Sequence, residues 1–153
     1  MKIVSQLLQS KGHDVWSITP DTTVYEALEQ MAEKNIGAVL VIESEQVVGI
    51  FSERDYARKV VLHGKSSQET PVSDVMTSRV IAVPPNQSVE KCMALMTEKR
   101  IRHLPVLDSD RLVGIISIGD VVKAIISDQE VMINHLEDYI TGQNWEEIRQ
   151  SAS

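Results

Sequence analysis

Two short segments of this 153-residue chain carry a glycine, a serine and an aspartate at the same spacing. Ser52 precedes Asp55 by three positions, and Ser117 precedes Asp120 by three. A serine at a strand-to-helix junction caps the helix, where free backbone N–H groups attract an anion. The aspartate on the first helical turn offers two acceptor oxygens, which suit the two hydroxyls of a ribose cis-diol. The pattern therefore predicts two sites for a ribose-containing ligand.

The same spacing also has a purely structural interpretation. Serine followed three residues later by an acid is a capping box, in which the two side chains satisfy N–H groups of the first helical turn. A single copy would favour the cap. Two copies at matching strand ends of a repeat favour a ligand site.

Both segments lie in an internal repeat, in which Thr19 to Val61 aligns with a second copy without a gap. A shift of 65 positions aligns Pro20 with Pro85, Val24 with Val89, Met31 with Met96, Ile36 with Ile101, Val41 with Val106, Gly49 with Gly114, Ser52 with Ser117 and Asp55 with Asp120. Upstream, residues 4–8 resemble 72–76, and three extra residues follow in the first copy. Self-similarity of this kind indicates two copies of one supersecondary unit.

Each copy predicts the element order β-α-β-β-α, because apolar residues recur at helical spacing and then form two short runs around a polar turn. The expected helices cover 21–34 and 85–99, the expected strands cover 15–18, 38–42, 47–51, 80–83, 103–107 and 112–116, and a further helix begins near Ser52 and near Ser117. The polar stretch from His63 to Pro71 is expected to link the copies.

We therefore expect one repeat over residues 1–65, a second over 66–140 with an extended last helix, and a loose tail over 141–153. Trp145 suggests one docking contact for that tail. The last helix carries an apolar stripe of Ile125, Met132, Leu136 and Tyr139. Such a stripe packs either on its own sheet or on a second chain, and the sequence leaves both alternatives open.

Composition excludes several classes of function. The chain is 42% hydrophobic and 24% charged, as in ordinary globular proteins, and its formal net charge of −7 argues against a nucleic-acid-binding surface. Cys92 is the only cysteine and lies between apolar helix positions, so we expect a buried, inert thiol and no disulfide. No apolar run approaches the roughly 20 residues that span a bilayer. A cytoplasmic protein without a membrane partner is expected.

Motifs of catalysis and metal binding are missing from the sequence. It contains no G-x-x-x-x-G-K-[ST] phosphate loop and no G-x-S-x-G nucleophile segment. The four histidines, at positions 13, 63, 103 and 135, show no metal-ligand spacing among themselves or with Cys92. We therefore expect neither an enzyme nor a metal site.

The duplicated unit resembles a tandem cystathionine-β-synthase (CBS) domain pair, also called a Bateman module, over nearly the whole chain. It is similar to the small stand-alone members from bacteria and plant mitochondria. The segments that carry the resemblance are IFSERDY at 50–56, DVMT at 74–77, RIRHLPV at 100–106 and SIGDVV at 117–122. The resemblance implies an α+β fold, in which two β-α-β-β-α repeats related by a pseudo-twofold axis form one module with two clefts between them.

The resemblance also implies which residues line the clefts. The first site would combine Ser52, Arg54 and Asp55 with Ile101, Arg102, His103 and Pro105. The second would combine Ser117, Gly119 and Asp120 with Thr22, Ala27, Ile36 and Gly37. Arg102 and His103 are similar to the basic pair that meets phosphates in the nucleotide-binding γ subunit of AMP-activated protein kinase. Because Gly37 and Ala38 stand at the matching positions of the first copy, the first site is expected to be the better equipped with cations.

The function implied is that of a regulatory sensor without a catalytic cofactor. AMP is the preferred ligand, and ADP, ATP or NAD(H) are further candidates. Occupancy would change the relative orientation of the repeats, and a homodimer would signal in trans to an unidentified protein. The alternative is a structural or oligomerisation module whose clefts bind nothing.

Overall fold

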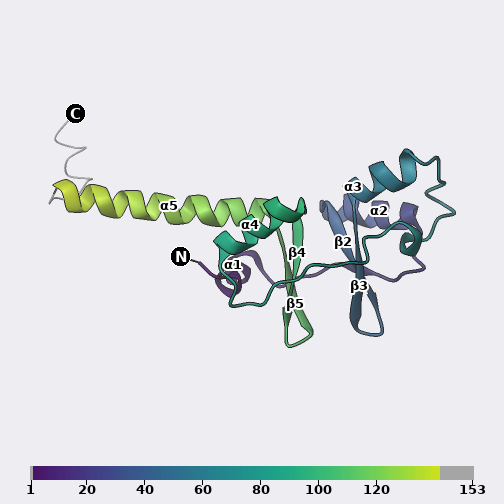
Figure 1. Ribbon diagram of the computed structural model, residues 1–153, viewed down its shortest axis with the longest axis horizontal. Coiled ribbons are helices and arrows are strands. Elements are labelled where there is room, and N and C mark those ends of the chain that lie inside the picture. The colour runs from purple at the N-terminus through teal and green to yellow at the C-terminus, as the bar shows by residue number, and fades with distance from the viewer. Residues whose placement is uncertain (1, 142–153) are drawn as a thin grey trace.

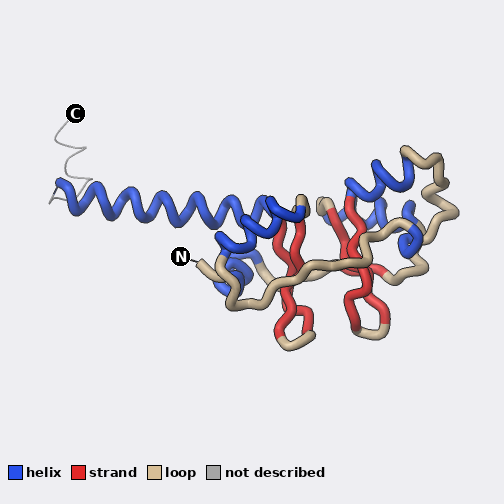
Figure 2. Tube along the Cα trace, in the orientation of Figure 1, coloured by secondary structure: helices blue, strands red, loops and turns tan. Residues whose placement is uncertain are grey.

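The computed structural model describes residues 2–141 as two β-hairpins that lie side by side, with helices packed around them and one long helix that extends away (Figure 1). Figure 2 shows the two hairpins in red, with their tips pointing the same way. Each hairpin is the centre of one of the two repeats. The mixed α+β fold expected from the sequence is confirmed.

The first repeat contains α2 (Val24–Lys34), β2 (Ala38–Glu43), β3 (Gln46–Ser52), the single turn α3 (Glu53–Asp55) and a π-helical segment at Tyr56–Val61. Before them lie α1 (Val4–Lys11) and the short β1 (Ser17–Ile18), which pairs in parallel with β2. The expected helix over 21–34 begins later, at Val24. Thr23 is its N-cap, with a side-chain oxygen that accepts from Glu26 N at 3.2 Å.

The second repeat contains α4 (Val89–Lys99), β4 (His103–Asp108), β5 (Arg111–Ser117) and α5 (Ile118–Thr141). Before them, a single 3₁₀ turn covers Val72–Asp74. Ser88 caps α4 as Thr23 caps α2. The hairpins also agree, since β2 pairs with β3 and β4 with β5 in antiparallel fashion, with a register shift at the same relative place. Both hairpin turns place two residues at positive φ, as tight hairpins require.

The strand expected over 80–83 is reduced to one bridge in the structure. Val83 pairs in parallel with Val106, through Val83 N to Pro105 O at 3.1 Å and Leu107 N to Val83 O at 3.0 Å. Extension of this ladder back toward Val80 would need Pro105 of β4 as a donor, and Pro105 has no backbone N–H. This strand expectation was wrong in extent.

The segments that open the two sequence repeats are exchanged between the two cores. Val4, Leu7 and Leu8 of α1 are buried in the core of the second repeat, beside Val89 and Leu104. The segment that opens the second copy, with Val72 and Val75, is buried in the core of the first, beside Val24 and Phe51. The division of the chain at residue 65 remains a prediction from the sequence, but each core contains side chains from both sides of it.

The last helix is as long as expected, because α5 runs to Thr141. Its beginning packs on the second repeat through Val121 and Ala124, and Ile125 lies partly buried against the same core. Beyond that point α5 extends from the body (Figure 1), and Met132, Leu136 and Tyr139 are exposed. Packing of the stripe on its own sheet is therefore wrong past Ile125. The expected loose tail and the contact of Trp145 lie outside the described residues.

Candidate functional site

Asp120 is held at the start of α5 by the cap that its spacing predicts. Its Oδ2 accepts from Ser117 N at 2.8 Å, and Ser117 Oγ accepts from Asp120 N at 3.2 Å. The Ser117 side chain also forms a hydrogen bond with this carboxylate, and the Asp120 side chain is 24% exposed. The capping interpretation is thus correct for Asp120, whose carboxylate stays partly accessible.

The other partner of Asp120 is Lys11, the last residue of α1. Lys11 Nζ lies 2.5 Å from Asp120 Oδ2 and donates to Ile115 O at 2.7 Å. Burial alone would raise the pKa of Asp120, but the hydrogen bonds from Lys11 and Ser117 outweigh it and hold that pKa below its ordinary value. Asp120 is therefore a carboxylate at neutral pH.

His103 opens β4 and faces the first repeat. A Cβ atom built on Gly37 would lie 3.7 Å from His103 Cε1, so the imidazole packs against the glycine that precedes β2. Burial lowers the pKa of His103, and the positive charges of Lys11 and then Arg102 lower it further, while Asp120 partly offsets them. His103 is consequently neutral at physiological pH. An anion bound beside it would raise its pKa again and favour the protonated imidazole.

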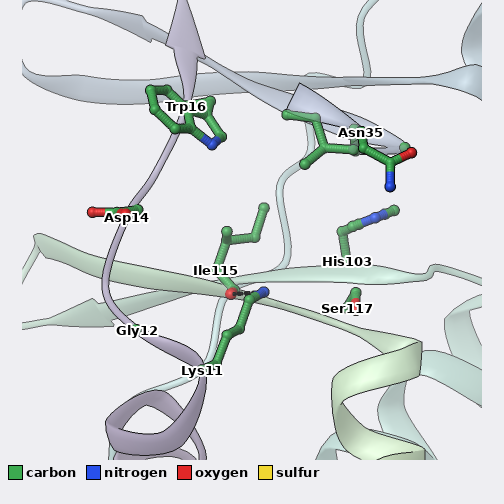
Figure 3. A pocket seen from close by; sticks show the side chains of 11 residues that line it. Lys11, Gly12, Asp14, Trp16, Asn35, His103, Ile115 and Ser117 are labelled. Carbon is green, nitrogen blue, oxygen red and sulfur yellow. Dashed lines mark hydrogen bonds between the residues drawn. The ribbon is translucent and has the colours of Figure 1, made fainter. Parts of the chain in front are cut away.

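These side chains meet at a cleft of about 450 Å³ between the two repeats. Its walls come from α1 and the loop after it (Lys11, Gly12, Asp14, Trp16), from the first repeat (Asn35, Ile36, Gly37, Ala38) and from the second (His103, Ile115, Ser117). Figure 3 shows Lys11, Ile115, Ser117 and His103 on one side and Trp16 and Asn35 on the other. This volume lies within the range of about 300–1,000 Å³ that is typical of small-molecule sites.

A second hollow, of about 510 Å³, shares Asn35, Ile36 and Gly37 with the cleft. Its other walls are three apolar residues of α2, together with Glu53 and Tyr56, and its lining includes no cationic side chain. It is therefore less suited to an anionic ligand than the cleft that contains Lys11 and His103.

Asp55, the counterpart of Asp120, is 7% exposed and fully engaged. Its Oδ2 accepts from Ser52 N and Ser52 Oγ, both at 3.0 Å, and its Oδ1 accepts from Thr77 Oγ1 at 3.0 Å and lies 3.0 Å from Lys59 Nζ. A ribose could bond to this carboxylate only after displacing Thr77 or Lys59. The capping box is thus the role that the structure gives to Asp55.

The other residues expected in the first site are only partly brought together. Arg54 reaches the second repeat, where its Nη1 donates to Arg100 O at 2.9 Å. Arg102 is exposed, Ile101 lies partly buried against the core, and Pro105 is buried inside β4. His103, which was assigned to this site, lines the cleft beside Lys11 instead.

The residues expected in the second site also divide. Ser117, Ile36 and Gly37 line the cleft, and Asp120 lies behind Lys11. Ala27 is completely buried in the core of the first repeat, beneath the inward face of α2, so its side chain cannot touch a ligand. Thr22 bonds to Thr19 in the turn before α2, and Gly119 is exposed on the first turn of α5; neither lines the cleft.

The comparison of the two copies missed Lys11, which gives the second site a cation that the sequence analysis did not assign to it. Lys11 belongs to the stretch in which the first copy carries three extra residues, so that irregularity was the available signal. Trp16 was also missed, and its ring centroid lies 4.2 Å from Lys34 Nζ.

Cys92 is buried, and burial followed by the charge of Glu90 raises the pKa of its thiol to about 11. Residues 2–141 contain no group of three or more histidine, cysteine or acidic side chains that could hold a metal ion. Over the same residues, no helix is both long enough and apolar enough to span a membrane.

The fold and the cleft define a class of protein: a tandem module of two β-α-β-β-α repeats with a ligand-sized cleft between them. The family model for the CBS domain matches twice, at residues 4–62 and 72–127. The chain belongs to the CBS-domain family, and it carries a tandem pair of these domains.

Known proteins support this assignment over most of the chain. The mitochondrial CBS domain-containing protein CBSX3 of Arabidopsis thaliana is 40% identical over 149 residues, which cover 91% of this chain and 72% of the relative. A solved CBS-domain protein from Burkholderia ambifaria is 51% identical with a TM-score of 0.81, covering 84% of this chain and 96% of that one. The fold is also shared with the CBS domain pair of protein MJ0100, at 22% identity and a TM-score of 0.74, covering 84% and 98% of the two chains.

Proposed function

We propose that this protein is a regulatory module that binds an adenine nucleotide, AMP first among the candidates, in the cleft between Lys11, His103 and Ser117. The observation that carries the proposal is the pairing of an acceptor and a cation at this cleft: Ser117 and Lys11 both line it, and the partly exposed carboxylate of Asp120 contacts both of them from outside the lining. A nucleoside phosphate carries both a diol that needs an acceptor and an anion that needs a donor.

The phosphate would lie between Lys11 and His103. Charge-assisted hydrogen bonds to a phosphate are stronger than neutral ones, and the ammonium of Lys11 provides such a donor without reorganising the backbone. His103 would add a second one by taking up a proton, because an adjacent anion opposes the lowering of its pKa by burial and by Lys11. The ribose would then bond to Asp120 and Ser117, and the base would lie against Ile36 and Ile115.

Ligand binding at this cleft would regulate the protein by changing the relative orientation of the two repeats. The cleft walls come from both repeats and from α1, so a ligand that binds one arrangement more tightly shifts the population toward it. Lys11 adds to this coupling, because it joins α1 to the first turn of α5, at Asp120. The long α5 is then the element through which a change at the cleft reaches a distant surface.

The finer expectations from the sequence remain part of this proposal. They are a homodimer, signalling in trans to another protein, ADP, ATP or NAD(H) as alternative ligands, and no turnover of the nucleotide. The CBS pair of MJ0100 was solved in complex with 5′-methylthioadenosine and S-adenosyl-L-methionine, which supports an adenosine-containing ligand as a class. The cytoplasmic location stays a prediction, and the Arabidopsis relative is named as mitochondrial.

Thermal unfolding with and without each nucleotide tests the proposal. A ligand raises the apparent stability by RT ln(1 + [L]/Kd), which is about 2.7 kcal/mol at a hundredfold excess over Kd. The variant Asp120→Asn should lose this gain, since the amide cannot replace a carboxylate that accepts from both Lys11 and a ribose. Asp128→Asn is the matched control, because Asp128 also lies on α5 and pairs with a lysine of the N-terminal segment, Lys2, away from the cleft.

A second candidate function is a structural or oligomerisation module with no ligand. It is favoured by one observation, the complete use of Asp55 as a cap and as a partner of Thr77 and Lys59. If no adenine nucleotide stabilises the wild-type protein, this alternative replaces the sensor. If nucleotides stabilise Asp120→Asn as well as the wild type, the ligand binds elsewhere and the assignment of the cleft is wrong.

A further inference from the structure

An apolar stripe runs along the exposed side of α5 with the spacing of a coiled coil. Ile126, Ile133 and Ile140 recur every seven residues, and Val122, Gln129 and Leu136 alternate with them at three and four residues. We call these six residues the α5 stripe. Ile126 is 49% exposed, Ile133 and Leu136 are each 54% exposed, and Ile140 is 79% exposed. Met132 and Tyr139 widen the stripe along one edge.

The α5 stripe is not a continuation of the face by which α5 packs on its own repeat. Val121 and Ala124 are buried in the core, and Asp128 lies near Lys2. At 3.6 residues per turn, these positions lie roughly a third of a turn away from the stripe. The stripe is therefore exposed even beside the body, and its spacing keeps it on one face to the end of the helix.

We infer that the α5 stripe is the interface with a second copy of this chain, formed as a parallel two-stranded coiled coil. Isoleucine at a positions with leucine at d favours two parallel strands, and the stripe has isoleucine at all three a positions and Leu136 at one d position. Gln129 is the one polar side chain in the stripe, and in a parallel pair in register it faces the Gln129 of the second copy. A second α5 supplies the same heptads in the same register.

The charges of α5 disfavour a membrane or a nucleic acid as the partner of the stripe. Glu130 and Glu137 flank the stripe, Asp128 and Asp138 lie on other faces of α5, and the whole chain carries a formal net charge of −7. Helices that lie on membranes or nucleic acids need a basic polar face, which this segment does not present. None of these four acids enters the apolar seam of a two-stranded contact.

The size of the stripe indicates a reversible dimer. Its 19 residues from Val122 to Ile140 extend about 28 Å, and a contact one helix diameter wide, about 10 Å, covers roughly 280 Å² per chain. This is less than the roughly 800 Å² per partner of a standard stable interface. Association should accordingly depend on concentration. The inference does not rest on the proposed nucleotide site, and the contact would supply an interface for the proposed homodimer.

Sedimentation equilibrium of the full chain without nucleotide, over a wide range of concentrations, tests this inference. Ile133→Asn should weaken self-association by about tenfold or more, because it places an amide in the centre of the apolar seam. Val131→Asn is the matched control: Val131 is 52% exposed and lies two residues away, off the stripe, so the same substitution there should leave association unchanged. Circular dichroism and thermal unfolding verify that both variants keep their fold.

Cross-linking through a new cysteine tests the parallel orientation. In a parallel pair, Leu136 of one chain faces Leu136 of the other, so Leu136→Cys should form an intermolecular disulfide on mild oxidation and Val131→Cys should not. The buried Cys92 does not compete. The interface is overturned if the wild type is monomeric throughout, if Ile133→Asn associates as the wild type does, or if Val131→Asn weakens association equally. Failure of Leu136→Cys to cross-link a dimer overturns the parallel arrangement.

Discussion

Replacement of Lys11 by methionine tests the functional site most directly. The change removes one positive charge from the cleft and keeps most of the apolar length of the side chain. It deletes the contact of Nζ with Asp120 Oδ2 at 2.5 Å and the hydrogen bond to Ile115 O at 2.7 Å. The matched control is Lys59→Met, which removes the cation that lies 3.0 Å from Asp55 Oδ1 in the first repeat.

The expected loss of AMP affinity follows from the exposure of the Lys11–Asp120 pair. A hydrogen bond to a charged group contributes about 1.5–3 kcal/mol, and partial exposure places Lys11 toward the lower end of this range. We therefore expect Lys11→Met to weaken AMP binding about 10- to 30-fold. Adenosine, which has no phosphate, should lose far less, so the preference for AMP over adenosine should fall. Lys59→Met should bind AMP as the wild type does.

Isothermal titration calorimetry with AMP and adenosine on the three proteins measures these effects. Equal AMP affinity in Lys11→Met and the wild type would refute the phosphate position. A larger loss in Lys59→Met than in Lys11→Met would move the nucleotide to Asp55 and refute the choice of cleft, which would restore the first site expected from the sequence.

The pH dependence of Lys11→Met gives a check that needs no ligand. The pKa of Asp120 is lowered in the folded state from an ordinary value of 3.8. The ion pair therefore contributes stability above that ordinary value, and the contribution is lost as pH falls through the folded-state pKa. The difference in unfolding free energy between Lys11→Met and the wild type should be about 1 kcal/mol at neutral pH and should shrink in acid. A difference that persists unchanged in acid would contradict this account.

Two further predictions concern His103 and the exchanged helix. Because burial and then Lys11 lower the pKa of His103 from 6.5, its imidazole should titrate below that value in an NMR experiment. Its contribution to stability should be present above pH 6.5 and lost as pH falls through the folded-state pKa. AMP should shift this titration upward, and a His103 resonance that titrates above 6.5 without ligand would contradict the burial of the side chain. Gly114→Ala should destabilise the fold by about 1–3 kcal/mol in urea unfolding, because the new Cβ would lie 2.7 Å from Leu8 Cδ2. In the double variant Gly114→Ala/Leu8→Ala, the losses of unfolding free energy from the two single changes should be clearly non-additive. Strict additivity would show that α1 does not pack on the second repeat.

The elements were predictable because each is encoded by residues close together in the chain. The hairpins 38–43/46–52 and 103–108/111–117 match the expected strands to within a residue at each end, since apolar runs and a polar turn define them locally. The serine–aspartate spacing likewise predicted the caps of α3 and α5, whose bonds join residues three apart. The strand over 80–83 was overestimated, since its pairing depends on a distant partner, in which Pro105 has no backbone N–H to donate.

The site was predictable only in part. Ser117, Ile36, Gly37 and His103 line the cleft, although the sequence assigned His103 to the other site. Ala27 was placed at the ligand from the resemblance alone, and its apolar, inward position on α2 buries it. The contrast between Asp55 and Asp120 could not be predicted, because the two segments are nearly identical in pattern. What separates them is the set of donors outside the capping box, Lys59 and Thr77 for Asp55 and Lys11 for Asp120.

The amino-acid sequence alone determined that this protein is a duplicated β-α-β-β-α unit with two capped aspartates, because those features depend on periodicity and on spacings of a few residues. Only the tertiary structure decided that α1 packs on the second repeat and brings Lys11 to Asp120, a residue 109 positions away. The physical reason is that periodicity defines which face of an element is buried but not against which core it packs. The charge of the cleft, and hence the ligand it suits, follows from that choice.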